Sequence, residues 1–483
     1  MSRRLLGPFN RVEGDLEVRL EVEDGTIAEA RVNSPLFRGF EQILQGKDPR
    51  DALVYTPRIC GICSVSQSVA AARALAAAQG LEPSANGQLA TNLILAAENL
   101  ADHLTHFYLF FMPDFARPAY RDRLDDFAAI EARFKAQQGS AATEMLPARA
   151  EFLHITGLLA GKWPHSLALQ PGGTTRAIDA TERRRLLTLI RGFRRFLETR
   201  LFGETLEAID ALDSADALER HAANRPDSDF ARFLRLADRL ELQQLGRAAD
   251  GFMSYGAYAR GRSGKPLFAD GVWLDGATRA LDGDGIREDV SHSWINPDGE
   301  ALHPWQGSTL PQDDKAGAYS WCKAPRLDGR AVEVGAIARQ LIDGHPLIAD
   351  LVSRHGGNVH SRVVARLLEL ARVLPAMEDW AQALQPGAPF CHHGRLPQEG
   401  QGAGLVEAAR GSLGHWLRIR HGRILNYQII APTSWNFSPR DADSQPVALE
   451  QALAGTEVGD DEDPLAIQHI IRSFDPCMVC TVH

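Results

Sequence analysis

Alternating hydrophobic and charged residues mark the N-terminal part of the chain. Residues 15–22 place an apolar side chain at every second position, and Asp24-Gly25 follows before a second such run at residues 26–32. A period of two residues is typical of a strand, and Asp-Gly favours a tight turn. The pattern therefore predicts a β-hairpin, whose first strand has its apolar residues at Leu16, Val18, Leu20 and Val22.

Helical spacing replaces this alternation around residues 86–111. Asp102, His106 and Phe110 are four residues apart, which predicts that they share one face of a helix. Residues 181–200 also have apolar side chains at helical spacing, opposite a face rich in arginine. We interpret the arginine face as a solvated surface, with docking of an acidic partner as the alternative.

The middle and the end of the chain follow different patterns. Residues 205–300 are richer in Asp, Gly and Arg and have weak periodicity, which predicts helices joined by long surface loops. Residues 416–420 and 423–429 flank His421-Gly422, and this arrangement predicts a second hairpin near the C-terminus.

Charge and composition exclude several classes of function. The chain has 52 Lys+Arg against 62 Asp+Glu and a net charge of -10, so a nucleic-acid ligand is not expected. No run of about 18 uncharged apolar residues occurs, so no membrane span is expected. The 6 cysteines are too few for a disulfide scaffold, and four of them form two C-x-x-C pairs. We therefore expect metal-bound thiolates in a reducing compartment, the cytoplasm.

The two cysteine pairs carry the main chemical signal. Cys60 and Cys63 lie near one end of the chain, and Cys477 and Cys480 lie near the other. Thiolates are soft ligands that favour zinc, copper(I), iron-sulfur clusters and nickel. A structural zinc site is the general alternative, but zinc ribbons use pairs roughly 15 to 20 residues apart. Here a shared ion would join both ends of the protein.

The sequences around both pairs resemble the signature motifs of nickel-iron hydrogenase large subunits. The first motif is Arg-Ile-Cys-Gly-Ile-Cys at residues 58–63, and the second runs from Asp475-Pro476-Cys477 to His483. Further segments resemble the same family, at residues 11–14, 37–41, 407–411 and 431–436. The resemblance implies that the chain is the metal-carrying large subunit of a hydrogenase.

A nickel-iron centre is the cofactor that this resemblance implies. All four cysteines would bind nickel, with Cys60 and Cys477 as terminal ligands. Cys63 and Cys480 would bridge to an iron that carries carbon monoxide and cyanide. The substrate would be dihydrogen, split heterolytically so that a proton passes to a nearby base.

The resemblance also implies the residues that handle this proton. Cys477 would be the first base, and Glu13 would be the carboxylate that carries the proton outward. Arg410 would hold its guanidinium over the open metal position and orient a carboxylate, either Asp102 or Asp475.

Other positions are implied to surround the metals. Pro432 and Thr433 match the residues that pack the diatomic ligands of the iron, and Ala409 is assigned to the same group. Glu41 and His483 match positions that bind magnesium or a similar divalent ion near the C-terminus.

Several residues depart from the usual pattern of uptake enzymes. Asp15 stands where a histidine is typical, Gln67 replaces another histidine, and Ala409 replaces a proline. These differences resemble the regulatory, hydrogen-sensing branch of the family. Ile62 and Phe110 are bulkier than the usual residues, so we expect them to narrow the gas path and exclude dioxygen, with ordinary core packing as the alternative.

The cysteines that have no role in the metal site indicate which partner the chain needs. Only Cys322 and Cys391 are unassigned, so the chain cannot supply four thiolates for an iron-sulfur cluster. An iron-sulfur small subunit is therefore expected, and a sensor would add a signalling histidine kinase. An energy-conserving uptake hydrogenase is the enzyme alternative to the sensor. Outside the hydrogenases, the alternatives are a structural zinc protein and the related quinone-reducing subunit, which has lost the four cysteines that this chain retains.

The expected fold follows from the need for both cysteine motifs to converge. It is α+β and predominantly α, with a long-helix bundle core and small β elements at the N- and C-terminal ends. The expected organisation is an N-terminal β-hairpin segment (1–57), a helical core (58–380) and a C-terminal segment that returns to the active site (381–483), within one interwoven unit.

Overall fold

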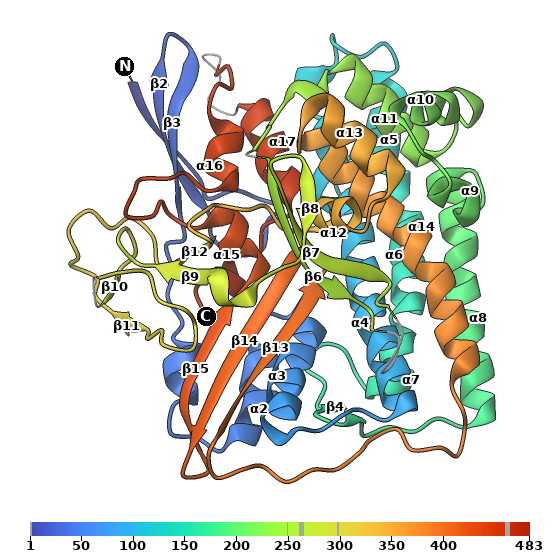
Figure 1. Cartoon of the computed structure of the whole chain (residues 1–483). Coiled ribbons are helices and arrows are strands. Elements are labelled where there is room, and N and C mark those ends of the chain that lie inside the picture. Colours follow the sequence, from blue (N-terminus) through green and yellow to red (C-terminus); the bar gives the residue numbers. More distant parts are fainter. Residues whose placement is uncertain (1, 249, 260–264, 297–298, 459–463) are drawn as a thin grey trace.

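The chain combines a bundle of long helices with several small antiparallel sheets (Figure 1). The computed structural model describes residues 2–248, 250–259, 265–296, 299–458 and 464–483. Three long helices pack side by side on the right of the view, namely α4 (Ala85–Thr105), α8 (Ala180–Phe196) and α14 (Val359–Ala383). The predicted class, α+β and predominantly α, is confirmed.

Shorter elements complete the architecture. The remaining helices include α1 (Phe40–Leu44), α2 (Ala52–Tyr55), α5 (Phe127–Phe134), α6 (Ser140–Phe152), α7 (His154–Ala160), α12 (Ala336–Ile342), α13 (Pro346–His355), α17 (Leu465–Phe474) and α18 (Met478–Thr481). Short strand pairs are formed by β4 (Leu169–Gln170), β5 (Gly173–Thr174), β9 (Ile286–Asp289), β10 (Ile295–Asn296), β11 (Leu310–Pro311) and β12 (Ala324–Leu327). Among the described residues, no helix is both long enough and apolar enough to cross a bilayer.

The predicted N-terminal hairpin is present as strands β2 (Glu17–Glu23) and β3 (Thr26–Asn33). Asp24 and Gly25 in the turn have φ values of 49° and 79°, a left-handed conformation that Gly and Asp tolerate. An additional edge strand, β1 (Ser2–Leu6), pairs with β2, and the sequence pattern did not predict it.

Helix α4 begins at Ser84, whose side chain accepts a hydrogen bond from the backbone N–H of Gly87. At its C-terminal end the chain continues as a π-helix, η3 (His106–Phe111). The wider π turn interrupts the four-residue spacing. Asp102 and His106 are buried, whereas Phe110, inside the π-helix, is only half-buried, so the α-helical spacing on which the predicted shared face depended does not extend to Phe110.

The prediction for residues 205–300 is wrong in part. Helices α9 (Leu206–Asp210), α10 (Ala215–Asn224) and α11 (Asp229–Arg239) are present, but a three-stranded antiparallel sheet follows them. Its strands are β6 (Gly251–Ala257), β7 (Phe268–Leu274) and β8 (Ala277–Arg279). The first four residues of β6 are all buried, so this strand lacks the alternation that identifies a strand from sequence.

The predicted C-terminal hairpin is confirmed as β14 (Gly411–Arg420) and β15 (Arg423–Ile430), with β13 (Gly400–Ala408) added on the other side of β14. Helix α3 (Ser64–Gln79) packs closely against β13. A Cβ atom on Gly404 would lie 1.9 Å from the carbonyl oxygen of Ala70, so only glycine permits this approach. The contact brings the N-terminal end of α3 and the C-terminal end of β13 to the same region.

Glu450 joins the N-terminal sheet to α16 (Ala448–Leu453) and supports a prediction about pH. Its carboxylate accepts hydrogen bonds from Val32 N (3.0 Å) and the Tyr319 hydroxyl (3.1 Å), and Arg440 lies 3.2 Å away. Burial nevertheless raises the pKa of Glu450 to about 7. A raised folded-state pKa stabilises the fold below the unfolded-state pKa, and this stabilisation is lost as the pH rises towards 7.

We therefore expect Glu450→Gln to flatten the pH dependence of stability. Between pH 5 and 8 the free energy of unfolding of the unmodified protein should fall by roughly 2–3 kcal/mol more than that of the variant. Urea unfolding over a pH series measures the difference, with Glu23→Gln at an exposed position as the control. Parallel pH profiles for Glu450→Gln and the unmodified protein would contradict the prediction.

Candidate metal centre

The four motif cysteines converge on one point in the interior. Sγ of Cys60 lies 3.5 Å from that of Cys477, and Sγ of Cys63 lies 3.3 Å from that of Cys480. Cys477 and Cys480 are 3.0 Å apart, and all four sulfurs lie within 4.8 Å of one another. Thiolates bound tetrahedrally at about 2.3 Å from a metal are roughly 3.8 Å apart, so these spacings fit a shared metal ion.

The first cysteine pair is held by a turn that leads into α3. The backbone N–H groups of Ile62 and Cys63 point to Sγ of Cys60, at 3.3 Å and 3.5 Å. Cys63 is the N-cap residue of α3. Arg38 donates to the carbonyl oxygen of Arg58 at 3.1 Å and to that of Ile59, so the segment before the turn is also anchored.

Glu98 on α4 caps the same turn, and the sequence analysis missed it. Its carboxylate accepts hydrogen bonds from Val65 N (2.8 Å), Ser66 N (2.9 Å) and the Trp163 indole (3.0 Å). The first two donors are backbone N–H groups of the first turn of α3, where a carboxylate is favourable. Glu98 lies four residues before Asp102, so extending the helical spacing backwards would have found it.

The second pair is fastened to the N-terminal segment. Glu13 and Cys477 form an isolated parallel bridge, in which Met478 N donates to Glu13 O at 2.7 Å. Thr433 accepts a hydrogen bond from Cys477 N at 3.0 Å through its hydroxyl. A Cβ on Gly14 would lie 2.9 Å from Val479, so glycine is required for this contact.

Electrostatics favour a cation between the sulfurs. Burial raises the pKa of Cys477 well above the usual thiol value, because the buried environment disfavours the charged thiolate. Hydrogen bonds among the neighbouring thiols raise the pKa of Cys63 in the same way. Metal ligation requires thiolates, so a bound soft cation and deprotonation of this cluster go together.

Arg410 lies beside the cysteine cluster and pairs with two carboxylates. Its guanidinium is 2.8 Å from Oδ2 of Asp102 and 3.1 Å from Oδ1 of Asp475, and it donates to the Asp475 carbonyl at 2.8 Å. Burial raises the pKa of Asp102 to about 7. Burial also opposes ionisation of Asp475, but Arg410 and the other positive groups nearby, which include Arg366, together hold the pKa of Asp475 below its usual value. The structure thus brings Arg410 to both carboxylates.

A small cavity of about 10 Å³ adjoins the cysteine cluster. It is lined by Cys63, Gln67, Ala408, Arg410, Leu413, Pro432, Thr433, Cys477 and Cys480. Pro432 and Thr433 begin helix α15 (Pro432–Phe437). Ala408 rather than Ala409 lines the cavity, while the Ala409 carbonyl accepts a hydrogen bond from Arg339 at 3.1 Å.

Three other predicted residues lie outside this lining. Ile62 is half-buried against the main core, beside Cys60. Phe110 is half-buried, and its carbonyl accepts a hydrogen bond from Arg11 at 3.3 Å. Asp15 is exposed. A role for Ile62 and Phe110 in gas access stays a prediction.

Glu41 and His483 come together as the sequence implied, with His483 Nε2 3.3 Å from Glu41 Oε1. Lys323 was not foreseen there. Its ammonium group lies 3.3 Å from the same Glu41 oxygen and 2.9 Å from Oε2 of Glu288. The buried lysine already compensates part of the negative charge. A magnesium ion at this place stays a prediction.

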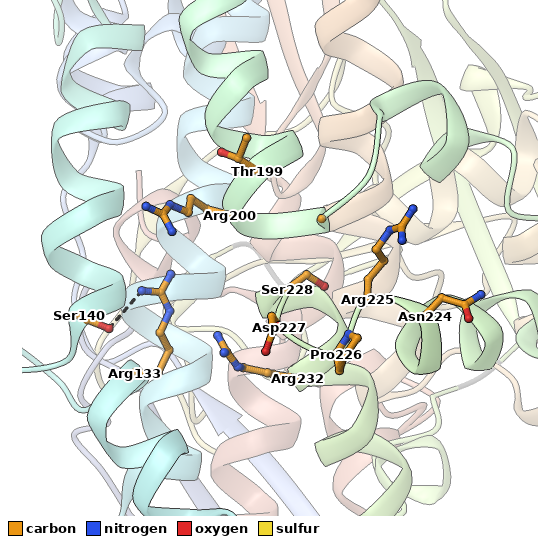
Figure 2. Close-up of a pocket in the computed structure, with 11 residues that line it drawn as sticks. Arg133, Ser140, Thr199, Arg200, Asn224, Arg225, Pro226, Asp227, Ser228 and Arg232 are labelled. Carbon is orange, nitrogen blue, oxygen red and sulfur yellow. Dashed lines mark hydrogen bonds between the residues drawn. The ribbon is translucent and has the colours of Figure 1, made fainter.

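A larger hollow lies elsewhere, among helices that do not carry the motif cysteines (Figure 2). Its lining includes Arg133, Arg200, Arg225 and Arg232. These guanidinium groups pair with nearby carboxylates, which are those of Glu144, Glu204 and Asp229. Each of these four guanidinium groups therefore already has a carboxylate partner, and the cysteine cluster remains the candidate site.

Known proteins are similar to this chain in sequence. The pattern of the family described as nickel-dependent hydrogenase matches residues 38–143 and 141–483. The periplasmic [NiFeSe] hydrogenase large subunit of Desulfomicrobium baculatum is 30% identical over 99% of this chain and 94% of its own length. The uptake hydrogenase large subunit of Rhodobacter capsulatus is 27% identical over 100% of this chain and 95% of its own length.

Solved structures agree with the sequence comparisons. The [NiFeSe] hydrogenase of Desulfomicrobium baculatum superposes with a TM-score of 0.86 at 29% identity, and 100% of each chain is covered. The family match includes all four converging cysteines, and the structural superposition extends over the whole chain. The chain therefore belongs to the nickel-dependent hydrogenase family, as a large subunit, and is an oxidoreductase that acts on dihydrogen.

Proposed function

We propose that this chain is the catalytic subunit of an uptake hydrogenase and oxidises dihydrogen at a nickel-iron centre. The observation that carries the proposal is the convergence of four buried sulfurs, from opposite ends of the chain, beside a cavity that Arg410 also lines. The names of the relatives, which are uptake and periplasmic hydrogenases, favour this role over the sensor role that the sequence analysis put first.

The centre, when bound to the four cysteines, supplies the heterolytic cleavage of dihydrogen, and its iron carries carbon monoxide and cyanide. Each dihydrogen yields two protons and two electrons. We assign the first proton acceptor to the sulfur of Cys477. Glu13, whose backbone pairs with that of Cys477, then carries the proton outward.

Arg410 and its two carboxylate partners orient and polarise the substrate. Arg410 presents a permanent charge towards the cavity, and its pairs with Asp102 and Asp475 keep the guanidinium in one orientation. Pro432 and Thr433 line the cavity, where the Thr433 hydroxyl, after accepting from Cys477 N, still has its own proton to donate to cyanide.

Electrons must leave through a partner. Outside the metal cluster the chain has only Cys322, which is buried, and Cys391, so it cannot ligate an iron-sulfur cluster with four thiolates. We therefore propose an iron-sulfur small subunit as the electron acceptor. We also propose a divalent ion, magnesium or similar, beside Glu41 and His483.

A hydrogen sensor is the second candidate function. Gln67 lines the cavity and is hydrogen-bonded to His415 at 2.8 Å, and a glutamine cannot exchange protons as the usual histidine can. A sensor would act through a histidine kinase. The cytoplasmic location expected with it receives no support from the comparisons, since one relative is named periplasmic.

Infrared spectroscopy of the purified large and small subunits together tests the proposed centre. We expect bands from metal-bound carbon monoxide and cyanide, bound nickel and iron, and dihydrogen-dependent dye reduction with a turnover of about 1–10³ per second. Zinc without nickel or iron would contradict the proposal. Slower turnover together with stable binding of a histidine kinase would favour the sensor over the uptake enzyme.

A further inference from the structure

Gln67 has a buried amide donor that faces the metal cavity without a partner. Its side chain is 0% exposed, and it lines the cavity together with Cys63 and Cys480. Within the described part of the chain, Nε2 of Gln67 has no hydrogen-bond acceptor. An unpaired donor in a buried position is costly, and native structures almost always supply an acceptor. The missing acceptor is therefore expected inside the cavity.

The other end of the Gln67 amide is fixed by two residues of the C-terminal sheet. His415 on β14 lies with Nε2 2.8 Å from Oε1 of Gln67, and its Nδ1 lies 2.8 Å from the hydroxyl of Tyr427 on β15. All three side chains are completely buried. Tyr427, His415 and Gln67 thus form one continuous chain of hydrogen bonds that ends at the cavity.

The direction of this chain follows from what each group can donate. Burial lowers the pKa of His415 to about 3, so its ring is neutral and has one N–H donor and one acceptor nitrogen. Burial also raises the pKa of Tyr427, which keeps its hydroxyl proton. If Tyr427 donates to Nδ1, then Nε2–H donates to the Gln67 oxygen, and the Gln67 N–H groups point into the cavity. If the hydrogen bonds ran in the opposite direction, the side-chain carbonyl oxygen of Gln67 would face the cysteine thiolates.

We propose that Gln67 donates a hydrogen bond from Nε2 to an electron-rich acceptor of the bound nickel-iron centre, and that His415 and Tyr427 are positioning residues that hold this orientation. The inference rests on the proposed function. Two acceptors share the required chemistry, namely a cyanide nitrogen on the iron and the sulfur of a bridging thiolate, Cys63 or Cys480. The bond tunes the electron density of the metals rather than transferring a proton.

The infrared spectrum of the metal-loaded complex of large and small subunits tests this bond without relying on activity. Gln67→Leu removes the donor, and we expect the cyanide bands to move to lower wavenumber. If cyanide is the acceptor, the cyanide bands move more than the carbon monoxide band. If a thiolate is the acceptor, the carbon monoxide band moves at least as much as the cyanide bands, because the sulfur then donates more charge to the metals.

A second variant keeps the test decisive if Gln67→Leu fails to bind metal. Tyr427→Phe leaves Gln67 intact but removes the donor that fixes the His415 ring, so we expect a smaller shift in the same direction. Gln340→Leu, which removes another buried glutamine outside the cavity, is the control and should leave all bands unchanged.

The outcomes separate this inference from the proposed function. Absence of carbon monoxide and cyanide bands in the unmodified complex would overturn the proposed function itself. Bands that are present and are identical in the unmodified complex and Gln67→Leu would overturn the Gln67 bond alone. If Gln67→Leu cannot be loaded, an unchanged spectrum for Tyr427→Phe overturns the oriented chain of hydrogen bonds.

Discussion

Replacing Cys480 by serine should abolish nickel binding and dihydrogen oxidation while the protein remains folded. Sγ of Cys480 lies 3.0 Å from Sγ of Cys477 and 3.3 Å from Sγ of Cys63, so Cys480 is close to two other ligands of the cluster. A serine hydroxyl is a hard donor and keeps its proton at neutral pH, which makes it a poor ligand for a soft metal. We expect nickel affinity to fall by at least about 100-fold.

Elemental analysis and dihydrogen-dependent dye reduction measure this effect, and circular dichroism checks the fold. Cys391→Ser is the matched control, because Cys391 is a free, half-buried cysteine outside the cluster. The control should keep both nickel and activity. A nickel-loaded, active Cys480→Ser variant would contradict the proposed ligand set.

Arg410→Lys should lower the rate of dihydrogen oxidation by about 10²- to 10³-fold, the loss usual for one preorganised charged donor. Lysine keeps the positive charge, so Asp102 and Asp475 are not left as unpaired buried carboxylates. An ammonium group cannot reproduce the fork that reaches both carboxylates and the Asp475 carbonyl. The variant should therefore bind nickel but turn over slowly.

The turnover number per bound nickel is the measurement that checks this prediction. Arg73→Lys serves as the control, since the Arg73 guanidinium bonds the Leu405 carbonyl and does not line the cavity. We expect the control to turn over at the normal rate. Unchanged turnover per nickel in Arg410→Lys would remove Arg410 from the reaction.

Local patterns predicted the elements whose signal lies within a few neighbouring residues. The hairpins β2–β3 and β14–β15 were found because apolar alternation and a turn stand next to each other in the sequence. The amphipathic helix α8 was found because one face is buried and the other is not. Strand β6 was missed because its burial on both sides removes the alternation, and the π turn at Phe110 carried no sequence signal that we recognised.

The partners of the metal site were harder to foresee than the ligands. Glu98, His415 and Lys323 bond to groups that are 32 or more residues away in the sequence. An isolated sequence does not reveal which of its many Glu, His and Lys residues meet a given motif. The pairing of the Arg410 guanidinium with both Asp102 and Asp475, where one was expected, is a result of the same kind.

The amino-acid sequence alone established the chemical character of this protein: four thiolates in two chelating pairs, the family that these motifs identify, and the helices and hairpins with strong local periodicity. The folded chain was needed to show that the sulfurs meet within 4.8 Å, that Gln67 aims a free donor into the cavity and that Lys323 lies between Glu41 and Glu288. The difference arises because ligand type and helical period are properties of neighbouring residues, whereas distance, burial and hydrogen-bond partner depend on how remote segments pack.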